Sequence, residues 1–195
     1  MAGLHLAGAD YQPRRANALG AAGWRPLLER CRARADEVQP GLVAELDADL
    51  SDILAAWPGV LPEGHIHADL FPDNVFFLDH HLSGLIDFYF AATDFLAFDV
   101  AVCLNAWCFE TDVSFNVTKG RALLNAYECL RPLSAAERAS LPALCRGAAL
   151  RFLLTRLYDW LNTPDGALVT RKDPIEYLRR LRFHRTARDE HAYGL

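Results

Sequence analysis

The sequence predicts an α+β protein that is mostly helical, with one small β-hairpin among the helices. Apolar residues recur at three-four spacing over most of the chain, which is the period of an amphipathic helix. Two short apolar runs, at 75–78 and 82–86, flank a polar turn as the strands of a hairpin do. At 195 residues and 52% hydrophobic composition, we expect a single domain spanning 1–195.

Before the hairpin, three segments are expected to be helical. Residues 2–23 are typical of a helix tail followed by a loop. Residues 25–38 predict a short helix with Pro26 in its first turn. Residues 41–57 predict a longer helix, with its apolar face at three-four spacing and acidic residues on the opposite face.

The second half of the chain predicts further helices. Pro142 is expected to bend or restart one of them, because proline lacks a backbone donor. Asp165-Gly166 predicts a turn. Helices are expected at 93–109, with Thr93 as cap, and at 119–130. The next helix should begin at a capping box formed by Ser134 and Glu137 and include the apolar segment 141–161. The last is expected at 175–191, after Asp173-Pro174.

Composition and charge exclude several classes of protein. A net charge of −5 argues against nucleic-acid binding, and no apolar run is long enough to cross a membrane. The five cysteines form no C-x-x-C pair, so we expect reduced packing residues in a cytoplasmic protein. The arginines of the last helix (Arg179, Arg180, Arg182, Arg185, Arg188) are interpreted as a solvated face.

The residues with most chemistry lie between His65 and Asp87. Carboxylate and amide oxygens are the ligands that suit Mg²⁺, and a carboxylate left off the metal can accept a proton from a hydroxyl. Asp69, Asn74 five positions later, and Asp87 beyond the hairpin form the pattern used in kinase-type phosphoryl transfer. Asp73 is interpreted as a turn residue.

Three motifs carry a resemblance to a known family. His67-Ala-Asp69-Leu-Phe-Pro-Asp-Asn74 resembles the H-x-D-x-x-x-x-N signature of the aminoglycoside phosphotransferase and choline kinase group, which is protein-kinase-like. Ile86-Asp87-Phe88 and Asp99-Val-Ala101 resemble the motifs that follow it. Within this group the chain is most similar to bacterial homoserine kinases, and the similarity covers nearly its whole length.

The resemblance implies an activity and a set of roles. The activity is ATP-dependent phosphorylation of the side-chain hydroxyl of L-homoserine, a step toward threonine, with ATP as co-substrate and Mg²⁺ as cofactor. The catalytic and metal segment would be 65–101. The implied roles are catalytic base for Asp69, Mg²⁺ ligands for Asn74 and Asp87, loop braces for His67 and Asp99, and lining of the amino-acid pocket for Tyr89, Asn105 and Trp107.

The same resemblance predicts that the chain is the C-terminal lobe of such a kinase. An N-terminal sheet lobe with a phosphate-binding loop and a strand lysine is not recognisable, and no lysine precedes Lys119. We therefore expect impaired nucleotide binding and slow turnover.

Three alternatives stay open at this point. One is a related phosphotransferase with another small hydroxylated substrate. Another is a zinc hydrolase, since His65-x-His67-x-Asp69 resembles a metal-ligand pattern. The third is a non-catalytic lobe that binds a partner or forms a homodimer through an apolar surface near the start of the chain.

Overall fold

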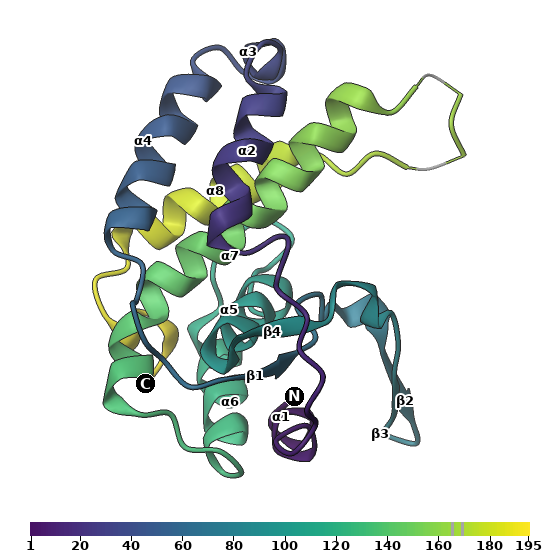
Figure 1. Ribbon diagram of the computed structural model, residues 1–195, viewed down its shortest axis with the longest axis vertical. Coiled ribbons are helices and arrows are strands. Elements are labelled where there is room, and N and C mark those ends of the chain that lie inside the picture. The colour runs from purple at the N-terminus through teal and green to yellow at the C-terminus, as the bar shows by residue number, and fades with distance from the viewer. Residues whose placement is uncertain (165, 169) are drawn as a thin grey trace.

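The computed structural model describes residues 1–164, 166–168 and 170–195. Helices form most of the body, and one of two small antiparallel sheets projects from it as a hairpin (Figure 1). The helices are α1 (Ala2–Ala7), α2 (Ala21–Cys31), α3 (Ala35–Val38), α4 (Leu42–Ala55), α5 (Leu96–Trp107), α6 (Val117–Glu128), α7 (Ala135–Asn162) and α8 (Pro174–Thr186). The strands are β1 (Glu63–Ile66), β2 (Val75–Leu78), β3 (His81–Leu85) and β4 (Ala92–Phe95), and 3₁₀ turns are η1 (Pro72–Asn74), η2 (Phe88–Phe90) and η3 (Glu190–Tyr193).

The predicted class, mostly helical with a small hairpin, is confirmed. α7 lies at the centre of the helical body and packs against α2, α5 and α8. The predicted capping box is present, since the Ser134 hydroxyl accepts from the Glu137 amide at 3.2 Å and the Glu137 carboxylate accepts from the Ser134 amide at 2.9 Å. Both bonds satisfy amides that the first helical turn leaves without intrahelical partners.

Pro142 was expected to bend or restart a helix, and of these the restart is wrong, because α7 continues through this residue to Asn162. Interior proline costs a helix about 3 kcal/mol. The long buried face of α7, which includes Leu144, Leu150 and Leu157, outweighs that cost. None of the helices in the described part of the chain is long and apolar enough to span a bilayer.

The helix predicted at 25–38 is two helices. α2 begins earlier, at Ala21, so Pro26 lies inside it rather than in its first turn, and a turn separates it from α3. The early start buries Trp24 completely, and its indole donates to the Leu19 carbonyl at 2.8 Å. Burial of this large ring decides where α2 begins. The position of Pro26 in the sequence does not reveal that burial.

The two sheets differ in how well the sequence predicts them. The β2–β3 hairpin is confirmed, and Asp79 and His80 in its turn both have positive φ, as a two-residue turn of type I′ requires. The β1–β4 pair was not expected. It places Thr93 opposite His65, so Thr93 is a strand residue and not the cap of α5. The predicted turn at Asp165-Gly166 includes a residue outside those described.

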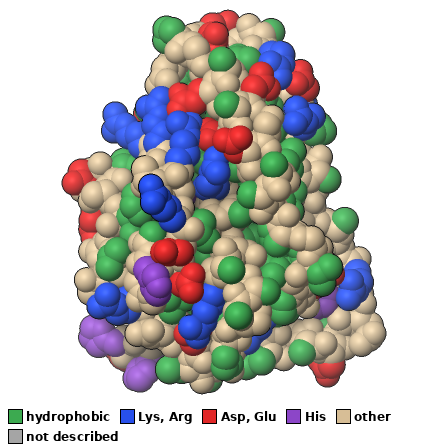
Figure 2. Space-filling view, turned by 90° about the vertical axis from the view of Figure 1, so that its left-hand side faces the viewer, with side chains coloured by type: hydrophobic (Ala, Val, Ile, Leu, Met, Phe, Trp, Pro, Cys, Tyr) green, Lys and Arg blue, Asp and Glu red, His purple; other side chains and the backbone are tan. Residues whose placement is uncertain are grey.

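The arginines of α8 are not simply solvated. Arg182 forms a two-point ion pair with Glu45 of α4, at 2.8 and 2.7 Å, and Arg185 binds both Glu45 and Asp49. The hydrogen bonds from Arg182 and Arg185 lower the pKa of Glu45 to about 2. Figure 2 shows basic and acidic side chains gathered side by side on this face of the molecule. These pairs connect two helices that are distant in sequence. The pattern of residues along a single helix could not indicate such a connection.

His184 of α8 joins three segments inside the core. It is completely buried, its Nε2 lies 3.1 Å from the Asn105 side-chain oxygen, and its Nδ1 lies 3.0 Å from the Tyr193 hydroxyl. The amide oxygen can only accept, so the ring carries its proton on Nε2 and accepts from the Tyr193 hydroxyl. Burial lowers the pKa of His184 to about 3, and this residue is therefore neutral near pH 7.

This neutral histidine predicts an acid-sensitive core. Below pH 6.5 the unfolded chain protonates His184 while the folded chain does not until about pH 3, so stability falls as pH drops through that window. The loss approaches about 1.4 kcal/mol for each pH unit. His184→Gln should be less stable than wild type at pH 7.5, but the difference should shrink toward pH 4.5.

Urea denaturation at several pH values measures this. Exposed His81→Gln in β3 is the matched control. Parallel pH profiles for wild type and His184→Gln would contradict the assignment.

Candidate active site

The loop after β1 is fixed by one buried carboxylate. Asp99 of α5 is completely buried, and its two oxygens accept from the amides of His67 at 3.0 Å and Ala68 at 2.8 Å. His5 of α1 lies 3.1 Å from one of the same oxygens. Burial alone would raise the pKa of Asp99, but the hydrogen bonds from His5, His67 and Ala68 hold it below its ordinary value. The loop is therefore connected to a charged, buried anchor.

His67 connects this loop to the end of β3. Its Nε2 donates to the Ile86 carbonyl at 2.9 Å, and its Nδ1 accepts from the Asp69 amide at 3.3 Å. The ring is buried and lies 4.6 Å from that of Phe88, measured between centroids. Both ring nitrogens are occupied, so the imidazole orients the backbone around Asp69.

Asp69 lies at the surface of a cavity with a buried arginine behind it. Its side chain is 19% exposed, and its Oδ1 lies 3.8 Å from Nη2 of Arg151 in α7. Arg151 also donates to the Ala68 carbonyl. Burial raises the pKa of Asp69 above its ordinary value, while Arg151 acts to lower it and Asp87 to raise it. Asp69 is thus a carboxylate with increased proton affinity in a fixed position.

Asn74 and Asp87 line the same cavity. The Asn74 amide nitrogen donates to the Asp69 backbone carbonyl at 2.8 Å, which leaves the amide oxygen available as a ligand. Asp87 has φ of 61° and ψ of 57°, a left-handed conformation that is uncommon outside glycine and asparagine. The structure therefore brings together the three residues that the sequence singled out.

This group of oxygens fits Mg²⁺ better than zinc. The Asp87 carboxylate and the Asn74 amide oxygen suit an ion that keeps several waters and shares phosphate ligands. His65 and His67 instead use Nε2 to bond the carbonyls of Tyr11 and Ile86. Within the described residues, no group of three or more His, Cys, Asp and Glu side chains is placed to hold a metal. The zinc hydrolase alternative therefore lacks a ligand set there.

The residues expected to line the amino-acid pocket do not lie in this cavity. Tyr89 is 71% exposed, and its carbonyl accepts from Arg15. Asn105 is buried and bonded to Ala101, Cys145 and His184. Trp107 donates to the Leu70 carbonyl at 2.8 Å and lines a different, apolar cavity. Their prediction as pocket residues gains no support from these positions.

The sequence reasoning missed the basic side chains that line the cavity. The cavity has a volume of about 660 Å³, and Arg151, Arg156 and Lys172 line it together with the acidic residues. Arg156 is paired with Glu176 of α8 at 2.6 Å. The available signal in the sequence was that Arg151 is a single charged residue inside the apolar run 148–154, because a buried charge needs a partner.

Comparison with known proteins shows the family to which the chain belongs. The model of the phosphotransferase enzyme family matches residues 1–133, and the chain belongs to that family. Curated relatives named homoserine kinase include proteins of Acidiphilium cryptum, 69% identical, and of Granulibacter bethesdensis and Xanthobacter autotrophicus, each 66% identical. Each match covers 100% of this chain and 61% of the relative, so the chain spans about three fifths of their length.

The buried anchor predicts a large stability effect. Asp99→Asn replaces an acceptor oxygen by an amide group that faces a backbone donor, and it removes the charge opposite His5. Breaking such a buried pair costs about 3–5 kcal/mol. We expect a loss of that size in the free energy of unfolding measured with urea. Asp52→Asn, an exposed substitution of the same kind in α4, should change it by less than about 0.5 kcal/mol.

Proposed function

We propose that this chain carries the phosphoryl acceptor site of an ATP-dependent kinase that acts on the side-chain hydroxyl of L-homoserine. The observation that carries the proposal is Asp69, held between Asp99-bound backbone and Arg151 at the surface of a cavity that it shares with Asn74 and Asp87. The phosphotransferase family and the name of the relatives reported above support this choice of reaction and substrate.

Asp69 would act as the proton acceptor. The substrate hydroxyl oxygen forms a bond to the terminal phosphorus of ATP, the bond from that phosphorus to the ADP oxygen breaks, and the hydroxyl proton passes to the Asp69 carboxylate. The increased proton affinity of Asp69 favours this transfer, and Arg151 stabilises the ionised form that must begin it. His67 keeps the Asp69 backbone in place.

Asn74 and Asp87 would hold Mg²⁺ through the amide and carboxylate oxygens that line the cavity. When bound, the ion would neutralise charge on the nucleotide phosphates. The hydrogen bond from the Asn74 amide nitrogen to the Asp69 carbonyl fixes which atom of Asn74 faces the cavity. The metal and proton-acceptor positions are therefore coupled through one backbone group.

This role for Asp69 predicts the effect of its removal. Asp69→Asn keeps the shape of the side chain but cannot accept the hydroxyl proton, so kcat should fall about 10²- to 10⁴-fold. Transfer of labelled phosphate from ATP measures it. Asp79→Asn, in the exposed hairpin turn, is the matched control and should change kcat less than twofold. Equal kcat values for wild type and Asp69→Asn would exclude Asp69 as the base.

A substrate panel tests the specificity. Labelled ATP offered with L-homoserine, L-serine, choline or an aminoglycoside should give fastest transfer to L-homoserine, and faster transfer to another member would reassign the substrate. For these 195 residues alone we expect slower turnover than for the longer relatives, because phosphoryl transfer depends on positioning groups around the nucleotide. A rate equal to theirs would contradict that expectation.

Self-association is a second candidate function, favoured by the hairpin surface. Phe77, Leu78 and Leu82 are each more than half exposed, and Phe77 and Leu82 border an apolar cavity of about 920 Å³. A second copy covering this surface would remove apolar area from water. Light scattering should then show a dimer that Phe77→Ser dissociates. A monomer at high micromolar concentration would reject this candidate.

A further inference from the structure

The basic side chains that line the candidate active-site cavity differ in how far their charges are neutralised. Arg151 lies beside Asp69, and Arg156 is paired with Glu176. Lys172 lines the same cavity, yet no ion pair joins it to any residue of the described ranges. The neighbouring Asp173 carboxylate is engaged as the N-cap of α8, where it accepts from the Ile175 amide at 2.8 Å. Lys172 is therefore a cation whose charge is left for a ligand.

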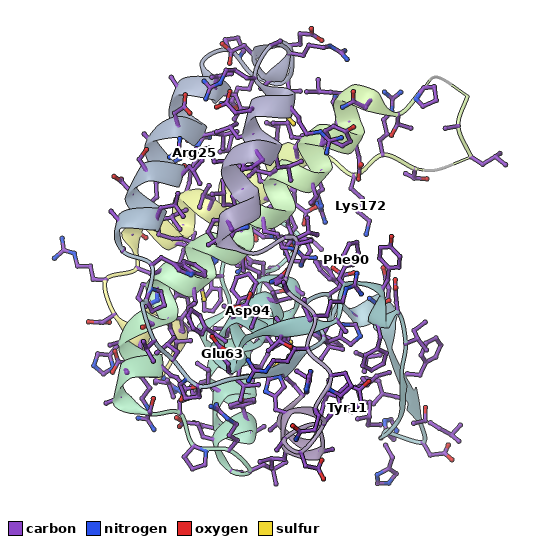
Figure 3. All side chains as sticks on the ribbon, in the orientation of Figure 1. Tyr11, Arg25, Glu63, Phe90, Asp94 and Lys172 are labelled. Carbon is purple, nitrogen blue, oxygen red and sulfur yellow. The ribbon has the colours of Figure 1, made fainter. Side chains whose placement is uncertain are left out.

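Lys172 points toward the cavity beside the loop that follows β1. Figure 3 shows its side chain extending from the segment before α8 toward Phe90, which also lines the cavity. Its ammonium lies 5.8 Å from the centre of the Phe71 ring, and the Phe71 amide donates to the Asp69 carbonyl at 2.8 Å. The ammonium is thus close to the residue that would receive the substrate proton, and its charge acts on Asp69.

An unpaired carboxylate lines the same cavity. Asp159 lies in the last turn of α7, and within the part of the chain that the structure describes it forms no ion pair. A phosphate group would meet repulsion from this carboxylate. A molecule that carries both a carboxylate and an ammonium group would meet an opposite charge at each, because Lys172 and Asp159 supply one of each sign.

We propose that Lys172 binds the α-carboxylate of an amino-acid substrate and that Asp159 binds its α-ammonium. This inference rests on the proposed function, because it takes the substrate hydroxyl to lie at Asp69. The two charges would then orient a short zwitterion whose hydroxyl is a few bonds from both groups. A neutral alcohol would lack both contacts, so the pair would set specificity while Asp69 performs the chemistry.

Two analogues of L-homoserine separate the two contacts. 3-Aminopropan-1-ol keeps the hydroxyl and the ammonium but lacks the carboxylate, and 4-hydroxybutanoate keeps the hydroxyl and the carboxylate but lacks the ammonium. Wild type should bind and phosphorylate L-homoserine in preference to both. Binding is measured by calorimetry without nucleotide, and phosphorylation by transfer from labelled ATP.

The variants should lose one preference each. Lys172→Met should weaken L-homoserine binding about 10- to 100-fold and raise KM similarly, leave kcat within threefold, and remove the preference over 3-aminopropan-1-ol. Asp159→Asn should instead remove the preference over 4-hydroxybutanoate. Lys172→Arg should restore most of the affinity. Lys119→Met, which removes the other lysine of the chain, and Asp52→Asn are the matched controls.

Several outcomes would overturn the inference. If Lys172 acted on the transferred phosphoryl group, Lys172→Met would lower kcat equally for all three compounds and leave calorimetric binding unchanged. If wild type bound none of them, or did not discriminate among them, the zwitterion site would be excluded. Lys172-dependent binding of L-homoserine without any phosphate transfer would instead contradict the proposed function and leave this site standing. Urea denaturation of each variant checks that it folds.

Discussion

The hydrogen bonds of the Asp99 carboxylate are the constraint on which the geometry of the candidate site depends. A buried charge that loses its partners is costly, so the loop that supplies the His67 and Ala68 amides cannot move away without leaving that charge unpaired. Ala68 has a positive φ of 63°, which is unfavourable for a residue with a Cβ. The bonds to Asp99 stabilise this conformation and thereby set the direction in which Asp69 leaves the loop.

Arg151 holds the same peptide from the other side. Its guanidinium donates to the Ala68 carbonyl, lies 4.1 Å from the centre of the Phe152 ring and faces Asp69. Ala68 therefore donates to a buried anion from α5 and accepts from a buried cation from α7. Burial lowers the pKa of Arg151 to about 10, so it stays charged near pH 7. A fixed loop between opposite buried charges is what positioning catalysis requires.

The cavity beside this loop is lined by side chains of both charges, which suits the proposed substrate with unlike ends. Asp69, Asn74 and Asp87 contribute oxygens to the lining, and Lys172 and Asp159 contribute one charge of each sign. Lys172 and Asp159, which we propose select the hydroxylated substrate, lie outside the segment matched by the family model, which ends at 133.

The sequence by itself determined the features that depend on neighbouring residues. The capping box at Ser134, the β2–β3 hairpin and most of the helices follow from local spacing and hydrogen bonding. Asp69, Asn74 and Asp87 could also be grouped from sequence, because a loop and one hairpin bring them together over a short stretch. Where apolar burial competed with a local signal, as at Trp24 and Pro142, the local signal was misleading.

Only the tertiary structure decided the contacts between distant segments. Arg151 lies 83 residues from Ala68 along the chain, and the β1–β4 pair joins strands too short to show a period of two. Arg182 and Arg185 bind acids of α4 more than a hundred residues earlier. Such pairings depend on how helices pack, and helix packing is set by side-chain shape and burial across the whole core rather than by any one segment.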